Sequence, residues 1–436
     1  MAPVFSKIGI IGAGVSGLAA AKRLAHHNPL VFEASDSIGG VWRHCSYSST
    51  KLQSLRCDYE FSDFPWPDRD STSFPSYTEI LEYLTSYANH FDVLKFVSFN
   101  SKVVEIRFVG DREATDLTGK PGNYPTILPG HPVWEVAVQT NHSDTIEWYA
   151  FEFLVVCIGK YGDVPKIPEF PRNKGPEIFQ GQVLHTIDYC KLQKEETSQL
   201  LKGKKVAVIG FKKSAIDLAL ECAEENQGPK GQPCTMVVRT LHWTVPHYWI
   251  WGLPLYMFYK TRSSQLLHEK PNQSFLRTLL CLLLSPMADV VVLATGYDGK
   301  KKLKAILPEP YRTLLEYPSG IMPLYRGTIH PLVPNMAFVG YLESVSNLPT
   351  SELHSIWLAR LVDEKFKLPS VEKMIEQTTK EMSVSKKTTR FYKRYCISTF
   401  SINHSDEICE EMGWNSWRKK NWISEAFSPY GSQDYI

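Results

Sequence analysis

Residues 7–33 read KIGIIGAGVSGLAAAKRLAHHNPLVFE, and this stretch decides the fold. The apolar run at 7–11 predicts a strand, residues 15–26 predict a helix, and residues 30–32 begin a second strand. This order of elements within about 30 residues is typical of a βαβ unit, in which both strands lie parallel in one sheet. The sequence therefore opens on an α/β fold.

Three glycines stand between the first strand and the helix. Gly12, Gly14 and Gly17 form GxGxxG, in which the first makes the turn, the second admits a pyrophosphate and the third lets the helix meet the strand. Glu33 follows Gly12 by 21 residues, matching the roughly 20 expected for a carboxylate that binds a ribose hydroxyl. The pattern predicts a dinucleotide site.

A second βαβ pattern starts near residue 205. Strands are expected at 205–209 and 235–238, with a helix at 214–225 between them. The proline-rich passage 164–172 precedes this pattern, and prolines can continue neither a helix nor a strand ladder. The passage therefore indicates a domain boundary.

The turn of the second pattern reads GFKKSA and departs from the first. Gly210 is kept and Ala215 is tolerated third, but Lys212 replaces the second glycine; with Ser214 it can neutralise a phosphate at the helix N-terminus. Arg239 stands where a carboxylate would bind ribose, which favours a 2′-phosphate and hence NADPH. An ordinary strand–turn–helix and a surface arginine remain the alternatives.

Composition excludes several classes of protein. The 436 residues are enough for two or three domains, and 48 basic against 46 acidic residues provide no field that recruits nucleic acid or a membrane surface. The nine cysteines contain no CxxC pair, so we expect neither a disulfide framework nor a metal site. No apolar run approaches the roughly 20 residues of a membrane span, and the N-terminus has no secretory pattern. We expect a soluble, cytoplasmic protein.

With its further motifs the chain resembles the flavin-containing monooxygenases, most nearly their plant branch, over almost its whole length. The motifs are GAGVSG at 12–17, GGVW at 39–42, FSDFPW at 61–66, FxGxxxHxxxY at 179–189, GFKKSA at 210–215 and ATGY at 294–297. The resemblance implies two Rossmann-like domains, with the FAD domain interrupted by an inserted NADPH domain. The expected segments are 1–165 for FAD, 166–287 for NADPH, and 288–436 for the FAD return segment and C-terminal region.

The resemblance also implies an activity and its site residues. NADPH reduces FAD, O₂ forms a C4a-hydroperoxyflavin, and a nitrogen or sulfur nucleophile of a small amine, amino acid or thioether takes the distal oxygen. The residues implied for FAD are Gly12, Gly14, Gly17, Glu33, Gly40 and Trp42, and those for NADPH are Gly210, Lys212, Ser214, Ala215 and Arg239. His185, Thr295 and Gly296 are implied at the cofactors without further assignment; alone, His185 would be read as a structural histidine.

No residue is assigned a catalytic role, because the cofactor carries the chemistry. Many members of the family have an asparagine near the flavin in a run like SLRTN. The corresponding run here is 54–58, in which Asp58 replaces the amide and is the one catalytic candidate.

One departure from the family lies inside the NADPH domain. Strands are expected at 93–99, 102–108, 133–138 and 145–151, the last two as a hairpin. This hairpin introduces the apolar strand expected at 153–158, whereas the similar strand expected at 288–295 directly follows the apolar run 275–284 and Pro286. Relatives have several tens of residues here, so the junction 286–288 predicts an internal deletion. Besides a coupled monooxygenase, the sequence leaves open a degenerate or peroxide-producing flavin binder and a Baeyer–Villiger oxygenase. Tyr189 disfavours the last, which usually has tryptophan there.

Overall fold

The computed structural model describes most of the chain. The described residues are 3–68, 73–111, 122–140, 145–173, 176–210, 212–229, 231–232, 234–238, 249–250, 253–254, 261–263, 298–315, 322–342, 344, 346–388 and 402–435. Arg239, Thr295, Gly296, the strand expected at 288–295 and the junction at 286–288 lie outside them, so the predictions on these residues stay predictions.

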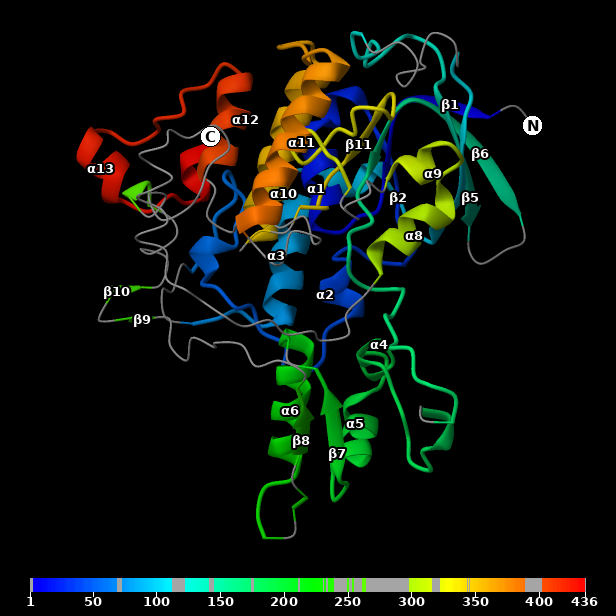
Figure 1. Ribbon diagram of the computed structural model, residues 1–436, viewed down its shortest axis with the longest axis vertical. Coiled ribbons are helices and arrows are strands. Elements are labelled where there is room, and N and C mark those ends of the chain that lie inside the picture. The colour runs from blue at the N-terminus through cyan, green and yellow to red at the C-terminus, as the bar shows by residue number, and fades with distance from the viewer. Residues whose placement is uncertain are drawn as a thin grey trace.

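A seven-stranded sheet forms the centre of the larger lobe (Figure 1). Its order is β3-β2-β1-β6-β5-β4, and β11 also pairs with β6. The pairs of β1 with β2 and with β6, of β2 with β3, and of β6 with β11 are parallel, whereas β4, β5 and β6 are joined antiparallel. The strands are β1 (Val4–Ile11), β2 (Leu30–Phe32), β3 (Val97–Ser98), β4 (Ser101–Phe108), β5 (Trp134–Thr140), β6 (Ile146–Val156) and β11 (Met336–Phe338).

The opening βαβ unit is confirmed. Helix α1 (Val15–Arg23) connects β1 to β2, and a short 3₁₀ turn at Ala25–His27 extends it to the predicted end. Gly9 to Ile11 of β1 lie beside Leu30 to Phe32 of β2 in parallel register. The glycine turn after β1 therefore lies at the carboxyl edge of the sheet, where open α/β sheets bind their ligands.

Two strand predictions are wrong in detail. The hairpin strand and the buried strand expected separately at 145–151 and 153–158 form one strand, β6, which pairs with β5 through its first half and with β1 and β11 through its second. The strand expected at 93–99 is mostly a 3₁₀ turn, Val93–Phe96, followed by the two residues of β3. Asp92 before that turn is left-handed, with φ of 52°, and the chain enters the 3₁₀ turn directly after it.

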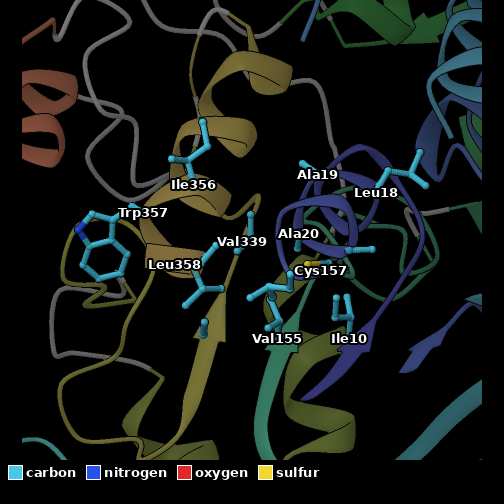
Figure 2. Close-up of a cluster of buried hydrophobic side chains, with 14 of the residues drawn as sticks. Ile10, Leu18, Ala19, Ala20, Val155, Cys157, Val339, Ile356, Trp357 and Leu358 are labelled. Atoms are coloured by element: carbon cyan, nitrogen blue, oxygen red, sulfur yellow. The ribbon is translucent and has the colours of Figure 1, made fainter. Parts of the chain in front are cut away.

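The main core lies where α1 meets helix α10 (Asn347–Val362) over the sheet (Figure 2). Ala19, Ala20 and Ala21 of α1 are fully buried, and their small side chains let the helices approach closely. Trp357 of α10 is equally buried, and β11 contributes Ala337 to the same cluster. The sequence reasoning missed both β11 and α10, although they build the centre of the fold.

The opposite face of the sheet is covered by α8 (Gly299–Ile306) and α9 (Tyr311–Leu314), whose buried residues join those of β4, β5 and β6. The remaining elements of the larger lobe and the C-terminal region are α2 (Val41–His44), α3 (Tyr77–His90), α11 (Val371–Thr388), α12 (Ile402–Glu411), α13 (Trp422–Phe427), β9 (Trp249–Ile250) and β10 (Leu253–Pro254). No helix within the described residues is long and apolar enough to cross a bilayer.

A smaller lobe contains the second βαβ unit and lies at the lower end of the molecule (Figure 1). Strands β7 (Val206–Ile209) and β8 (Cys234–Val237) pair in parallel, and α6 (Lys213–Glu225) connects them, which confirms the predicted elements. Helices α4 (Thr186–Tyr189) and α5 (Lys194–Leu201) precede β7. The chain reaches this lobe through the proline-rich passage 164–172, which forms neither helix nor strand.

Candidate functional site

The first and third glycines of the opening motif are explained by the protein itself. Gly12 has φ of +100°, and a Cβ there would lie 2.8 Å from the carbonyl oxygen of Cys157. A Cβ on Gly17 would lie 1.8 Å from the carbonyl oxygen of Gly12, because the first turn of α1 passes directly over the strand end. Both positions exclude larger residues whether or not a ligand is bound.

Gly14 is different, because nothing in the described part of the chain requires a glycine there. Its φ and ψ of −74° and −169° suit any residue, and a Cβ would meet only Gly40, at an ordinary 3.6 Å from its Cα. No side chain caps the N-terminus of α1, which begins at the next residue. An uncapped helix N-terminus reached across a bare backbone is the geometry that binds a pyrophosphate. The residues therefore fit a dinucleotide such as FAD.

Glu33 lies beside the same turn and is almost buried, at 9% exposure. The backbone N–H of Ala13 donates to its Oε2 at 2.8 Å, and the N–H and hydroxyl of Ser35 donate to Oε1 at 3.0 and 2.8 Å. The carboxyl group thus links the glycine turn to the end of β2. These contacts place Glu33 next to the predicted pyrophosphate cradle, where its role at a ribose hydroxyl stays a prediction.

The GGVW motif forms the facing side of this cradle. Gly40 has φ of +55°, and a Cβ on it would lie 3.2 Å from the Cα of Gly14, so the two backbones face each other closely. Trp42 follows in α2 and donates its indole N–H to the Tyr59 hydroxyl at 2.7 Å. Burial raises the pKa of Tyr59 far above its ordinary value, so it stays a neutral partner for this bond.

Asp58 directly precedes Tyr59 in a 3₁₀ turn, Arg56–Asp58, and is 6% exposed. Its backbone N–H donates to the carbonyl of Leu55 at 3.0 Å. The structure thus places Asp58 on the segment that holds Trp42. A catalytic role for it remains a prediction.

The second glycine turn, at 210–215, also joins a strand to an uncapped helix, but it has Lys212 where the first turn has Gly14. Gly210 has φ of +138°, and its N–H donates to the carbonyl of Val237 at 3.1 Å, which ties the turn to β8. Lys212 is extended at the start of α6, and no side chain caps that helix. Ala215 is buried in the first turn of α6, as its place in the motif predicts. An uncapped N-terminus with a lysine beside it fits an anionic group such as a phosphate of NADPH.

The residues of FxGxxxHxxxY separate into an exposed and a buried part. Phe179 is 62% exposed, whereas Tyr189 is 2% exposed. His185 is half-buried and begins α4, where its Nδ1 accepts from the backbone N–H of Ile187 at 3.2 Å. This histidine therefore has a local structural task, and its predicted role at a cofactor is an additional one.

A contact between the two lobes was missed from the sequence. The hydroxyl of Tyr189 donates to Oε2 of Glu221 at 2.6 Å, and Oε1 of Glu221 accepts from the Ser48 hydroxyl and the Ser49 backbone N–H, each at 2.8 Å. The Tyr47 hydroxyl donates to the carbonyl of Ser214 at 2.6 Å. The signal in the sequence was a carboxyl at 221 among apolar residues of the predicted helix 214–225.

One group of side chains among the described residues has the composition of a metal site. Nε2 of His26 and Nε2 of His27 lie 2.7 and 2.8 Å from the same oxygen, Oδ1 of Asp363. The group lies beyond the C-terminal end of α1, opposite the glycine turn. Its hydrogen bonds account for this arrangement, and we assign it no metal.

A sheet whose parallel strands open on a glycine turn with a carboxylate at the end of the next strand, followed by a second strand–turn–helix–strand unit, is the arrangement of a protein with two dinucleotide sites. The chain belongs to the flavin-binding monooxygenase-like family, whose model matches residues 5–283 and 284–418. FAD and NADPH are accordingly its cofactors, and O₂ with a small molecule are its substrates.

Individual relatives agree with this assignment and with the resemblance to plant members. The chain is 59% identical over 509 residues to a probable flavin-containing monooxygenase 1 of Arabidopsis thaliana, covering 99% of this chain and 96% of the relative. It is 57% identical to a putative flavin-containing monooxygenase 2 of the same plant, covering 93% and 97%. The solved S-allyl-L-cysteine S-oxygenase of Allium sativum is 19% identical with a TM-score of 0.62, covering 95% and 90%, and shows the same fold.

The comparisons also bear on the predicted deletion. The first Arabidopsis alignment spans 509 residues and this chain has 436, so at least 73 aligned positions have no counterpart here. The family model is interrupted between 283 and 284, close to the predicted junction at 286–288. The interruption falls in the part of the chain that follows the second glycine turn.

Proposed function

We propose that this chain is an NADPH-dependent flavin monooxygenase that oxygenates a nitrogen or sulfur nucleophile of a small molecule. The observation that supports the flavin site is Gly14. Its backbone conformation and its surroundings would accept a side chain, so the missing side chain is explained by a ligand that needs the space. Tyr189, where Baeyer–Villiger enzymes usually have tryptophan, favours this substrate class over ketones. Solved structures of the same fold do not choose between these classes, since the Allium sativum protein is named for sulfur oxygenation and a cyclohexanone monooxygenase matches with the same TM-score of 0.62.

The residues of this chain bind the two cofactors and orient them toward each other. FAD, when bound, supplies hydride acceptance and oxygen activation. The uncapped N-terminus of α1 and the facing glycines Gly14 and Gly40 hold its pyrophosphate, and Glu33 holds its ribose. Lys212 and the N-terminus of α6 hold the NADPH phosphates. We retain the division into FAD residues 1–165 and 288–436 and NADPH residues 166–287.

We also keep the cytoplasm as the proposed compartment. Within the described residues no cysteine forms a disulfide, and three of them, Cys157, Cys222 and Cys409, are buried. Thiols of this kind persist in a reducing compartment.

The test uses the complete chain purified and reconstituted with excess FAD. We expect a yellow protein that oxidises NADPH in air, and products one oxygen heavier when thioethers, amines and amino acids are screened by mass spectrometry. A chain that retains no flavin absorbance would overturn the proposal. Oxidation of a ketone to an ester, with no nitrogen or sulfur product, would replace it with the Baeyer–Villiger alternative.

A second candidate function is favoured by one observation, the interruption near residue 283. If the extra positions of the first Arabidopsis alignment lie at this interruption, the NADPH domain covers the reduced flavin less completely, and water at that site promotes release of hydrogen peroxide. The candidate is an uncoupled, peroxide-producing flavoprotein with weak reduction by NADPH.

Restoring the segment distinguishes the two functions. We expect insertion of the corresponding Arabidopsis segment after Leu283 to raise both the rate of flavin reduction and the fraction of NADPH converted to product. A glycine–serine insert of equal length is the matched control and should raise neither. Stoichiometric NADPH use and product formation by the unmodified chain would show a compact working enzyme instead.

A further inference from the structure

Among the described residues, Glu221 joins the two lobes through three hydrogen bonds. It lies on α6, is 6% exposed, and receives hydrogen bonds from Tyr189 of α4 and from Ser48 and Ser49 of the larger lobe. Three separate segments thus meet on one carboxyl group. Burying such a group without partners is costly, so this arrangement holds only when all three segments are in place.

The buried apolar cluster around this group is small. It consists of Tyr47 of the larger lobe with Tyr189, Leu201 and Cys222, and six partly buried side chains pack against it. The other side of α6 is open, with Leu220 50% exposed. Packing alone therefore provides little to fix the direction of α6, and the polar contacts carry that task.

A second tie lies close to the start of the helix. The Tyr47 hydroxyl donates to the carbonyl of Ser214 at 2.6 Å, and the Tyr47 ring meets the Tyr189 ring edge-on with centroids 5.3 Å apart. Ser214 belongs to the first turn of α6, next to Lys212. The contacts of Tyr47 and Glu221 thus fix α6 at two points about two turns apart.

We propose that Tyr189 and Glu221 are positioning residues, which set the N-terminus of α6 at the distance and angle from the larger lobe that hydride transfer to the flavin requires. The inference rests on the proposed function, because it assumes that NADPH is held at that helix end. It also explains the residue type that ends the FxGxxxHxxxY motif. A tyrosine places a hydroxyl donor on Oε2 of Glu221, whereas phenylalanine has no donor to place there.

The expected consequence is a change in rate more than in affinity. Lys212 and the helix N-terminus move together with the bound phosphates, so binding of NADPH survives a reorientation of α6. Hydride transfer does not, because a displacement of about 1 Å between reacting groups costs about 100-fold in rate.

The experiment compares anaerobic reduction of the bound FAD by NADPH in wild type, Tyr189→Phe, Glu221→Ala and Glu221→Gln. We expect the first two variants to lower the limiting reduction rate by about 10- to 100-fold while the Kd of NADPH changes less than about 3-fold. Glu221→Gln should recover most of the rate, since its amide oxygen still accepts from Ser48 and Ser49 and its amide N–H can donate to the hydroxyl oxygen of Tyr189. Reduction by dithionite should be equal in all of them.

Tyr149→Phe is the matched control. Tyr149 also donates its hydroxyl to a glutamate, Glu147, at 2.8 Å. It pairs with Val4, the first residue of β1, at the opposite end of the strand from the glycine turn. We expect this variant to reduce like wild type. An equal loss of rate in Tyr149→Phe, or a full rate in Glu221→Ala, would overturn the positioning role.

Hydrogen exchange separates the contact from the proposed function. The Ser49 N–H bonds directly to Glu221, so the peptide 45–52 should lose protection in Glu221→Ala and keep it in Tyr149→Phe. Unchanged protection in Glu221→Ala would show that the bond from Ser49 to Glu221 does not form. Loss of protection in Glu221→Ala, together with a wild type that NADPH cannot reduce, would leave the contact in place and reject the proposed function with its positioning role.

Discussion

The two βαβ units of this chain have the same order of elements but different surroundings. In the first, β1 has a parallel neighbour on each side, and Ile8 and Ile10 are fully buried. In the second, β7 pairs with β8 alone among the described residues, and Ile209 at its end is 60% exposed. The first unit is buried in the core of the larger lobe, whereas the second unit is exposed to solvent at the end of its strand β7.

The difference shows that the local sequence forms the glycine turn, whereas contacts with the rest of the molecule hold the helix that follows it in place. Gly12 and Gly210 both adopt positive φ, so the same local pattern makes both turns. The helix after Gly12 is fixed by apolar packing on α10, whereas the helix after Gly210 is fixed by hydrogen bonds from Tyr47, Ser48 and Ser49. We therefore expect the first site to hold its cofactor permanently and the second to depend on a few polar contacts.

The largest expected effect is loss of flavin from Gly14→Val. The backbone at Gly14 suits valine, so folding is retained, but the added methyl groups occupy the space in which the pyrophosphate approaches α1. We expect no flavin absorbance after reconstitution and an unchanged circular dichroism spectrum. Gly431→Val, at a position with nothing within 4 Å of a Cβ, is the control and should remain yellow. A yellow Gly14→Val protein would place the flavin elsewhere.

A pair of isoleucines tests the difference in packing directly. Ile10→Ala removes a fully buried side chain from the first unit and should destabilise the protein by about 2–5 kcal/mol. Ile209→Ala removes a side chain that is 60% exposed and should cost less than about 1 kcal/mol. Thermal unfolding of both variants checks this. Equal shifts of the transition would mean that the second unit is covered in solution.

Arg239→Ala sharpens the comparison at the cofactor level. If Arg239 pairs with the 2′-phosphate, its loss removes a charge-assisted contact of about 1.5–3 kcal/mol, or one to two decades of affinity for NADPH over NADH. Titration of both nucleotides into wild type and variant measures the ratio. An unchanged ratio would assign Arg239 to the protein surface.

The smallest effect concerns the far end of α1. Burial raises the pKa of Asp363, but hydrogen bonds from His26 and His27 outweigh it and lower that pKa below its ordinary value of 3.8. The stability from this lowering is present above that value and is lost as the pH falls through the folded pKa. The unfolding temperature of wild type should exceed that of Asp363→Asn at pH 5, and the difference should shrink below about pH 4. A constant difference would contradict the linkage.

Much of the fold could be predicted, because some segments adopt their secondary structure from their own local sequence. The apolar run at 7–11 and the glycines after it specify strand, turn and helix through their own conformations and packing. The same holds for the second unit, whose elements lie within a residue of the predicted bounds. Three-residue β11 has no periodicity to detect, and its place beside β6 depends on a partner 182 residues earlier, as the pair Met336 and Leu154 shows.

The candidate site divides in the same way. The sequence by itself determined the two glycine turns and the place of Glu33 beside the first of them, because spacing along one βαβ unit fixes which residues meet at its carboxyl edge. The order of the cofactors, FAD first and NADPH second, stays a prediction. Only the tertiary structure decided that Gly14 faces Gly40 and that Glu221 joins Tyr189 to Ser48. These contacts bring together residues far apart in the chain, and their geometry follows from how packed elements approach one another, which no local pattern records.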